Sequence, residues 1–281
     1  MTQPITNEIY IQFADATFPS INAATIKNDY VEIAENQFLL CVPDVMQMYV
    51  EDGNKILLLV EDNVDYKLVS AYILGTGMGV IMHQRGMLLL HGSCVTKEDQ
   101  AIVFIGPSGA GKSTMASEFM QHGWRLVSDD VVPVCFIDGK PFAQSSYPLQ
   151  KICMDVLDQY TAADADVYLQ HREDGRVKYY RDCSKDFQTG LSPISSIVLL
   201  SLTNKDMIIY ALIQNNVSEL IACAETIKRN VYRDWVSVTV AQKQSLFQKS
   251  IDLSGSVNLI VAQRNESNLA SELYQGILDQ L

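Results

Sequence analysis

The sequence is short of basic residues and of paired cysteines. Its 281 residues include 21 lysines and arginines against 33 aspartates and glutamates, a formal net charge of −12. An acidic chain repels the phosphate backbone of nucleic acids, so we expect no nucleic-acid partner. The six cysteines, at positions 41, 94, 135, 153, 183 and 223, form no CxxC pair. This spacing argues against a zinc site or a disulfide framework and favours reduced thiols in a cytoplasmic protein.

Long uninterrupted hydrophobic runs are also missing. The most apolar stretch, AYILGTGMGVIMHQRGMLLLHGS at 71–93, is interrupted by His83, Gln84 and Arg85 after about a dozen residues, too few to span a bilayer. The first residues, MTQPITNEIYIQF, contain no basic segment followed by an apolar run, so we expect no signal peptide. We therefore expect no membrane association.

Short strand-like segments fill the first part of the chain. They are EIYIQF, YVEIAE, QFLLCV, MQMYVE and KILLLVE, and turn residues such as DGN at 52–54 separate them. This spacing predicts a small, mainly β N-terminal domain over residues 1–65.

The rest of the chain, residues 66–281, has the pattern of a larger α/β domain. A helix is predicted over 66–85, where Gly75, Gly77 and Gly79 would let another element pack closely. The predicted strands are GMLLLHGSCV, QAIVFIG, one or two within WRLVSDDVVPVCFI, RVKYYRD, SSIVLLSL and VNLIVAQ. The predicted helices are 112–122, capped by Gly123, then PLQKICMDVLDQY, 218–232 and SNLASELYQGILDQL.

A phosphate-binding motif lies between a buried strand and an amphipathic helix. GPSGAGKS at 106–113 satisfies G-x-x-x-x-G-K-[ST], and its flanking elements are those that the motif requires. Glycines let successive backbone N–H groups point at phosphate oxygens, and the helix N-terminus adds partial positive charge. Lys112 would bridge the β- and γ-phosphates, and the Ser113 hydroxyl would complete a Mg²⁺ shell. The residues expected to bind ATP are Gly106, Pro107, Ser108, Gly109, Ala110, Gly111, Lys112, Ser113 and Thr114.

Two adjacent carboxylates, Asp129 and Asp130, follow the phosphate-binding motif after one predicted helix and one predicted strand. Ligands of open α/β sheets bind at this end of the strands. One carboxylate would hold Mg²⁺ and the other would accept a proton from an attacking hydroxyl. The working assignment puts Asp130 with Ser113 at the metal, but the opposite division stays open because a one-residue shift on a strand reverses the side-chain direction. The alternative is a polar turn after the strand.

His91 interrupts the apolar strand LLLHGSCV before the phosphate-binding motif. A polar residue in such a run costs free energy unless it is paired. We interpret His91 as a catalytic-site residue that orients a phosphate, a metal-bound water or an aspartate; a satisfied core histidine is the alternative.

Three segments together, QRGMLLLHGSCV (84–95), IGPSGAGKST (105–114) and GWRLVSDDVVPV (123–134), resemble the HPr kinase/phosphorylase family. The resemblance implies a P-loop kinase domain whose fold is similar to phosphoenolpyruvate carboxykinase, and phosphorylation of a serine on a protein. It implies that Lys112 and Ser113 bind ATP–Mg²⁺ and that Asp129 and Asp130 divide the metal and base roles. His91 matches the family's active-site histidine. The relatives are often oligomers, so a homo-oligomer is a further expectation.

The pattern is more similar still to the HPr-kinase-like kinases that phosphorylate the C-terminal serine of lasso precursor peptides. The arginine-rich C-terminal signature of the bifunctional enzymes is missing, and their N-terminal domain is larger. The resemblance therefore does not carry phosphorolysis, or HPr as substrate, to this chain.

A basic cluster lies in HREDGRVKYYRDCSK at 171–185, where the family has a flexible loop with a lysine that contacts phosphates. Its members are Arg172, Arg176, Lys178, Arg181 and Lys185. The alternative is a solvated hairpin around Asp174-Gly175.

Three functions follow from these motifs. The leading hypothesis is an ATP-dependent serine kinase for a peptide or small protein, with Asp129, Asp130, Lys112 and His91 in its catalytic site. A small-molecule phosphotransferase would use the same residues but would need a basic pocket for its acceptor, for which the sequence supplies no clear set. A non-catalytic, ATP-binding regulatory protein would not need both aspartates.

Overall fold

The computed structural model describes residues 8–14, 18–153, 168–170, 178–212, 216–265 and 267–281. The chain forms two compact units. One comprises Met1–Leu88 and Arg233–Leu246, and the other comprises Leu89–Tyr232 and Phe247–Leu281.

The first unit contains a six-stranded sheet in the order β1-β6-β5-β4-β3-β2. Its strands are β1 (Tyr10–Phe13), β2 (Ile26–Lys27), β3 (Val31–Ala34), β4 (Gln37–Val42), β5 (Met46–Glu51) and β6 (Lys55–Val60). All neighbours are antiparallel except β1 and β6. The predicted turn at 52–54 joins β5 to β6, and Asp52 and Gly53 both have positive φ, as a tight hairpin requires.

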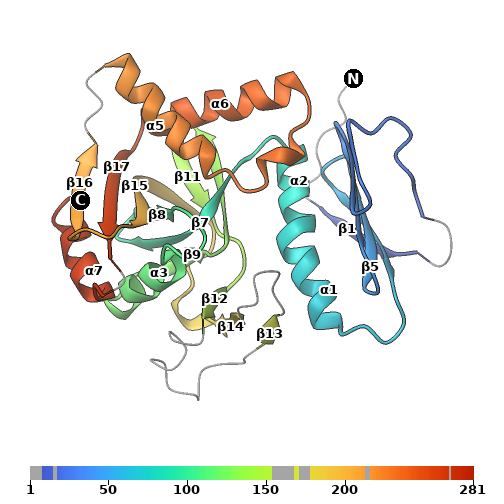
Figure 1. Ribbon diagram of the computed structural model, residues 1–281, viewed down its shortest axis with the longest axis horizontal. Helices are drawn as coiled ribbons and strands as arrows, with labels where there is room; N and C mark the ends of the chain where they lie inside the picture. The colour runs from blue at the N-terminus through green and yellow to red at the C-terminus, as the bar shows by residue number, and fades with distance from the viewer. Residues whose placement is uncertain (1–7, 15–17, 154–167, 171–177, 213–215, 266) are drawn as a thin grey trace. The chain divides into compact units, whose positions relative to one another are not determined.

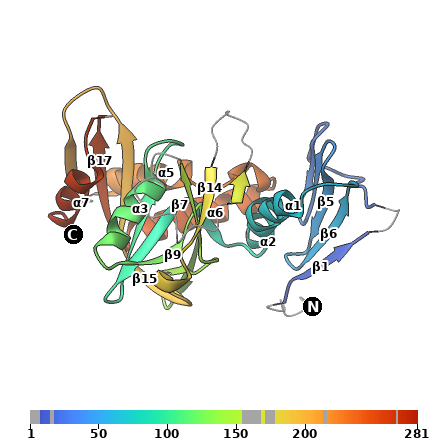
Figure 2. The same ribbon diagram turned by 90° about the horizontal axis from the view of Figure 1, so that it is seen from below.

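A helical segment covers one face of this sheet (Figures 1 and 2). It consists of α1 (Tyr66–Tyr72), a π-helical turn (Ile73–Gly77) and α2 (Met78–Gln84). A Cβ on Gly77 would lie 3.1 Å from the side chains of Met48 and Ile56, so the glycine permits close packing, as predicted. The structure thus groups residues 66–88 with the N-terminal unit, whereas the predicted boundary is at residue 65. Val69, Val80 and other residues of the segment complete the core beneath the sheet.

The second unit is built on an eight-stranded mixed sheet in the order β11-β10-β7-β8-β15-β17-β16, with β9 paired to β7. Its strands are β7 (Leu88–Lys97), β8 (Gln100–Ile105), β9 (Arg125–Ser128), β10 (Val131–Ile137), β11 (Lys140–Gln144), β15 (Leu191–Leu202), β16 (Ile208–Leu212) and β17 (Asn258–Arg264). The central strands β8, β15 and β17 are parallel, so their carboxyl ends meet at one edge. The described strands β12 (Leu149–Cys153), β14 (Lys178–Asp182) and β13 (Tyr168–Gln170) form a separate small sheet.

Helices lie on both faces of the large sheet (Figure 1). They are α3 (Lys112–Gln121), α5 (Val217–Arg229), α7 (Ala270–Leu278) and the part of α6 (Val240–Ser254) that follows Leu246, and a short 3₁₀ turn lies at Ser184–Asp186. The 3₁₀ turn at Asp234–Val236 belongs to the first unit, where Val236 joins the core of the six-stranded sheet. On one face α3 and α7 bury Phe119, Leu273 and Ile277 against Phe104 and Val198. Gly123 ends α3 with a φ of +81°, which confirms the predicted cap.

The structure corrects one predicted helix and adds elements that were not predicted. PLQKICMDVLDQY begins as strand β12, and residues 154–160 lie outside the described part. Pairing with β14 outweighs the local helical pattern, as tertiary context often does. Helix α6 and strands β2, β11, β13 and β16 carried no recognised signal in the sequence. No helix among the described residues is long and apolar enough to cross a membrane.

Candidate active site

The loop between β8 and α3 has the backbone that the phosphate-binding motif predicts. Gly106, Gly109 and Gly111 have φ values of +143°, +85° and +97°, which side-chain-bearing residues rarely adopt. A Cβ on Gly106 would lie 2.2 Å from the carbonyl oxygen of Leu200, so no other residue fits there. The predicted nucleotide residues 106–114 therefore form one loop and the first turn of α3, at the carboxyl edge of the sheet.

Lys112 begins α3 and lies against its own loop. Its ammonium donates to the carbonyl oxygens of Gly106, at 2.8 Å, and Pro107, at 3.1 Å. Together with the N-terminal backbone amides of α3, this places positive charge at the loop, as anion binding requires.

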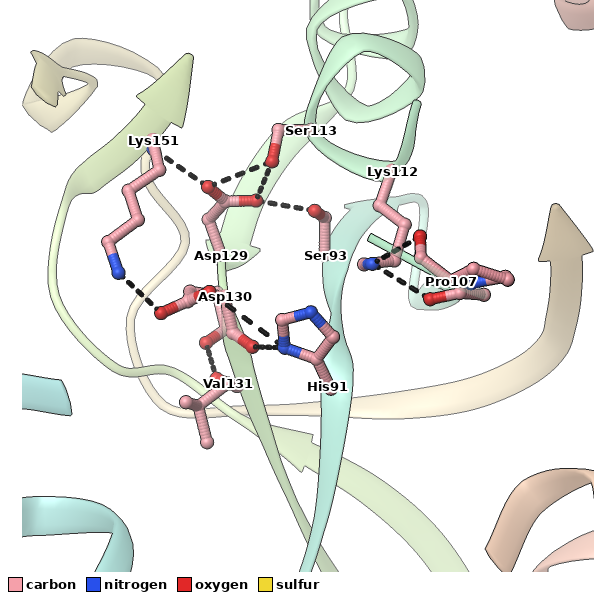
Figure 3. Close-up of polar contacts among 11 residues, drawn as sticks. His91, Ser93, Pro107, Lys112, Ser113, Asp129, Asp130, Val131 and Lys151 are labelled. Atoms are coloured by element: carbon pink, nitrogen blue, oxygen red, sulfur yellow. Dashed lines mark hydrogen bonds and ion pairs between the residues drawn. The ribbon is translucent and has the colours of Figure 1, made fainter. Parts of the chain in front are cut away.

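Asp129 lies at the end of β9 beside the first turn of α3 (Figure 3). Its carboxylate accepts hydrogen bonds from the Ser93 hydroxyl, from the Ser113 hydroxyl at 3.0 Å, and from the Lys151 backbone N–H at 2.8 Å. Only 2% of Asp129 is exposed, and burial raises the pKa of its carboxyl, to which the Asp130 charge contributes in the same direction. A cation would stabilise this buried negative charge.

Asp130 has a different environment, although it is the next residue. Its φ of +69° turns the chain, and its carboxylate lies 2.6 Å from the Lys151 ammonium (Figure 3). The left-handed conformation is one that Asp tolerates better than most residues. The working assignment paired Asp130 with Ser113, but the carboxylate that contacts the Ser113 hydroxyl is Asp129.

Lys151, on β12, is a site residue that the sequence reasoning missed. Burial lowers the pKa of its ammonium, but the charge of Asp130, the hydrogen bond to Asp130 and the neighbouring Tyr180 and Tyr147 together outweigh burial, so the net pKa is raised. The ammonium also lies 5.7 Å from the centre of the Tyr180 ring. The sequence predicts a helix for this segment, and no motif marks Lys151. Its place in the site depends on the long-range contacts of β12, which pairs with β14 and donates the Lys151 N–H to Asp129.

Gln150, the neighbour of Lys151, is the second missed residue. It is fully buried, donates from Nε2 to the Ser113 carbonyl oxygen at 3.0 Å, and accepts from the Ser117 hydroxyl at 2.9 Å. It thereby fixes the first turns of α3, which include Ser113 and Thr114, two of the residues predicted to bind nucleotide.

His91 points to the same site from β7. Its Nδ1 lies 3.1 Å from the carbonyl oxygen of Asp130 and 3.8 Å from the Asp130 carboxylate. Its ring stacks on Tyr232 with a centroid separation of 6.0 Å. The sequence leaves a phosphate, a metal-bound water or an aspartate open as the partner of His91, and the structure shows the contact with the aspartate.

The basic cluster at 171–185 is only partly described. Arg172 and Arg176 lie outside the described residues, and of Lys178 only the backbone is described, as the first residue of β14. Arg181 is buried and donates to the sulfur of Cys183 at 3.4 Å, and Lys185 is exposed.

The donor set at Asp129 fits Mg²⁺ bound together with a nucleotide. Within the described ranges, no group of three or more His, Cys, Asp or Glu residues converges to hold a metal alone. Mg²⁺ in phosphate sites uses one or two carboxylates and takes its other ligands from phosphate and water. The Asp129 carboxylate and the Ser113 hydroxyl lie 3.0 Å apart and could supply the protein's two ligands to such an ion.

Comparison with known proteins found three curated relatives, all named HPr kinase/phosphorylase. The protein of Clostridium tetani is 43% identical over 58 residues, which are 21% of this chain and 19% of the relative. That of Mycoplasmopsis pulmonis is 34% identical over 71 residues (25% and 23%), and that of Clostridium beijerinckii 43% identical over 56 residues (20% and 18%). These matches support the resemblance to HPr kinase/phosphorylase, and each spans about a fifth of the relative's length.

The remaining comparisons add little. No family profile matches the chain. Among solved structures, the Hpr(Ser) kinase/phosphatase of Coxiella burnetii aligns over 68% of this chain and 94% of its own, with 10% identity and a TM-score of 0.34.

Proposed function

We propose that this chain is an ATP-dependent serine kinase that transfers the γ-phosphoryl group to a serine of a peptide or small protein. The observation that carries the proposal is that the two adjacent carboxylates contact different residues. Asp129 contacts the hydroxyl of Ser113, next to the phosphate-binding lysine, and Asp130 pairs with Lys151. Two carboxylates with different partners suit a reaction that needs one metal ligand and one proton acceptor.

The phosphate loop would hold the triphosphate of ATP. The backbone N–H groups of 106–111 and the Lys112 ammonium would contact the phosphate oxygens. Asp129 and Ser113 would hold Mg²⁺, which neutralises phosphate charge when bound. The metal role thus goes to Asp129 in place of the working assignment to Asp130.

Asp130 would act as the general base. The substrate serine oxygen forms a bond to the γ-phosphorus as the bond from that phosphorus to the oxygen of ADP breaks, and the serine proton moves to the Asp130 carboxylate. Lys112 and the N-terminal amides of α3 would stabilise charge on the phosphoryl group during transfer. His91, in contact with the Asp130 carbonyl oxygen at 3.1 Å, would hold the base in place.

We take the acceptor class, a serine of a peptide or protein, from the similarity to the relatives named HPr kinase/phosphorylase. The chain matches about a fifth of the length of each of these relatives. Within that class we propose a lasso precursor peptide with a C-terminal serine as the first substrate to examine. A cytoplasmic location and a homo-oligomeric state are parts of the same proposal.

The test is phosphoryl transfer from γ-labelled ATP with Mg²⁺ to serine-ended peptides and small molecules, measured side by side. Label on a peptide serine that is lost in Asp129→Asn and Asp130→Asn supports the proposal. Asp138→Asn is the matched control, because Asp138 is exposed and its φ of +50° suits asparagine equally well. Label only on a small molecule, or ATP binding without transfer, would contradict it.

A further inference from the structure

The phosphate loop has different neighbours on its two sides. In the sheet, β8 lies between β7 and β15. The residues of the proposed transfer site lie on the β7 side of β8: His91 is on β7, and Asp129 and Asp130 form the turn between β9, which pairs with β7, and β10. On the other side of β8 the sheet continues through β15 to β17. If the γ-phosphate lies beside the carboxylates, the nucleoside must extend away from them, toward the β15 and β17 side of the loop.

The loop packs closely on the carboxyl ends of β15 and β17. A Cβ on Gly106 would lie 2.2 Å from the Leu200 carbonyl oxygen, and a Cβ on Gly111 would lie 3.3 Å from Nη2 of Arg264. Leu202 and Arg264 are partners in the parallel pairing of these two strands. Thr203 therefore lies three residues after the loop contact Leu200, and Asn265 lies one residue after the loop contact Arg264.

A pocket of about 570 Å³ lies at these strand ends. Its lining residues are Leu202, Thr203, Asn204, Asn265 and Ser267. The lining combines amide and hydroxyl groups with one exposed leucine side chain, and the volume is within the usual range for small-molecule sites.

Hydrogen bonds between the two strand ends hold the pocket's wall in shape. The Thr203 N–H donates to the Arg264 carbonyl oxygen at 2.9 Å, and the Asn265 amide donates to the Lys205 carbonyl oxygen at 3.4 Å. Asn265 also accepts from the backbone N–H and the hydroxyl of Ser267, at 2.9 and 2.6 Å. The amide of Asn265 is thus used within the wall.

Asn204 differs from Asn265. It is exposed, and in the described part of the chain its side-chain amide makes no hydrogen bond. An amide offers both a donor and an acceptor, the combination that recognises the edge of a nucleobase. The side chain of Leu202, 48% exposed, offers an apolar surface for the face of a base.

We propose that this pocket binds the nucleoside part of the nucleotide whose phosphates lie on the loop, with Asn204 contacting the base edge and Leu202 its face. The inference rests on the proposed function only in requiring that the loop binds a triphosphate. It extends that function by assigning residues that distinguish ATP from any other polyphosphate. Arg264 approaches Gly111 of the loop with Nη2 and donates from Nη1 to the carbonyl oxygen of the pocket residue Asn265, so it would lie where the nucleoside joins the phosphates.

The experiment measures the Kd of the full chain for Mg–ATP and for Mg–tripolyphosphate by calorimetry. Tripolyphosphate contains the phosphates without the nucleoside, so it reports on the loop alone. The variants are Asn204→Ala and Leu202→Ala. Asn258→Ala and Leu191→Ala are matched controls, because both residues are exposed at the opposite ends of β17 and β15.

Wild type is expected to bind Mg–ATP at least about tenfold more tightly than Mg–tripolyphosphate, and each pocket variant to raise the Kd for ATP about fivefold to tenfold. The Kd for tripolyphosphate should not change, which also shows that each variant is folded. Equal affinity of wild type for the two ligands, or an unchanged Kd for ATP in both variants, would overturn the pocket assignment alone. Failure of wild type to bind either ligand would overturn the proposed function as well.

Discussion

The ammonium of Lys151 lies 2.6 Å from the carboxylate of Asp130, while its own backbone N–H donates to Asp129 at 2.8 Å. One residue of β12 therefore contacts both members of the acidic pair, through different groups. The Asp130 carboxylate has a charged partner, the ammonium, and the Asp129 carboxylate has a neutral partner, the backbone N–H. This difference gives two chemically identical neighbours separate environments.

Replacing Lys151 should weaken transfer more than nucleotide binding. In Lys151→Met the Asp130 carboxylate loses its cation, so it should take up a proton at a higher pH than in wild type. We therefore expect the acidic limb of the rate–pH profile to move to higher pH. We also expect kcat at neutral pH to fall about tenfold, because the ammonium that lies 2.6 Å from the carboxylate no longer holds it in position. Lys151→Arg keeps the charge and should leave the limb near its original position. An unmoved limb in Lys151→Met would exclude this positioning role.

The sequence predicts those parts of the fold whose signals are local. Five of the six strands of the N-terminal sheet (all but β2), the strand–loop–helix around 106–121 and the cap at Gly123 follow from alternation, glycine positions and helix periodicity. The parallel strand β8 is apolar on both faces after Gln100, which is also readable from the sequence.

The rest depends on contacts between segments far apart in the sequence. The division between Asp129 and Asp130 was not predictable, because the positive φ of Asp130 decides where each carboxylate points. Lys151 and Gln150 reach the site only because 149–153 pairs with β14 as a strand, against its local helical pattern. No sequence motif marked the pocket at the ends of β15 and β17, since exposed Asn and Ser residues are common in loops.

Asp129→Asn should change the pH dependence of stability. Because burial raises the pKa of Asp129, the unfolded chain loses this proton first as pH rises, near its usual value of about 3.9. Between that value and the raised one the folded state holds more protons, so the stability contributed by this group is full at lower pH and falls as pH rises. The slope is at most about 1.4 kcal/mol per pH unit.

Thermal or urea unfolding across this pH window should show the slope in wild type and in Asp138→Asn, and a smaller slope in Asp129→Asn. Mg²⁺ with ATP should flatten the slope in wild type, because a bound cation stabilises the charged carboxylate. The same slope in Asp129→Asn as in wild type would contradict the inferred burial cost.

Gly106→Ala should damage the phosphate loop and the sheet together. The added Cβ would lie 2.2 Å from the Leu200 carbonyl oxygen, which is backbone and has little room to move. We expect a loss of about 3 kcal/mol in the free energy of unfolding, together with loss of nucleotide binding.

Gly123→Ala is the control. Gly123 also has a positive φ, but a Cβ there meets nothing within 4 Å, so only backbone strain of about 1 kcal/mol applies. Urea unfolding of the two variants measures the difference, and equal losses would show that strain alone, not the contact with Leu200, is responsible.

His91 should affect the rate through the position of Asp130. A carbonyl oxygen can only accept, so the Nδ1 that lies 3.1 Å from the Asp130 carbonyl carries the hydrogen. His91→Ala removes this donor and should lower kcat about tenfold while leaving the Kd for Mg–ATP unchanged, because His91 is not part of the loop. His91→Asn keeps an N–H donor near the position of Nδ1 and should recover most of the rate. Single-turnover transfer combined with ATP titrations separates the two effects. A rate that falls equally in both variants would mean that the ring does more than hold Asp130, and a weaker affinity for ATP in His91→Ala would mean that it contacts the nucleotide.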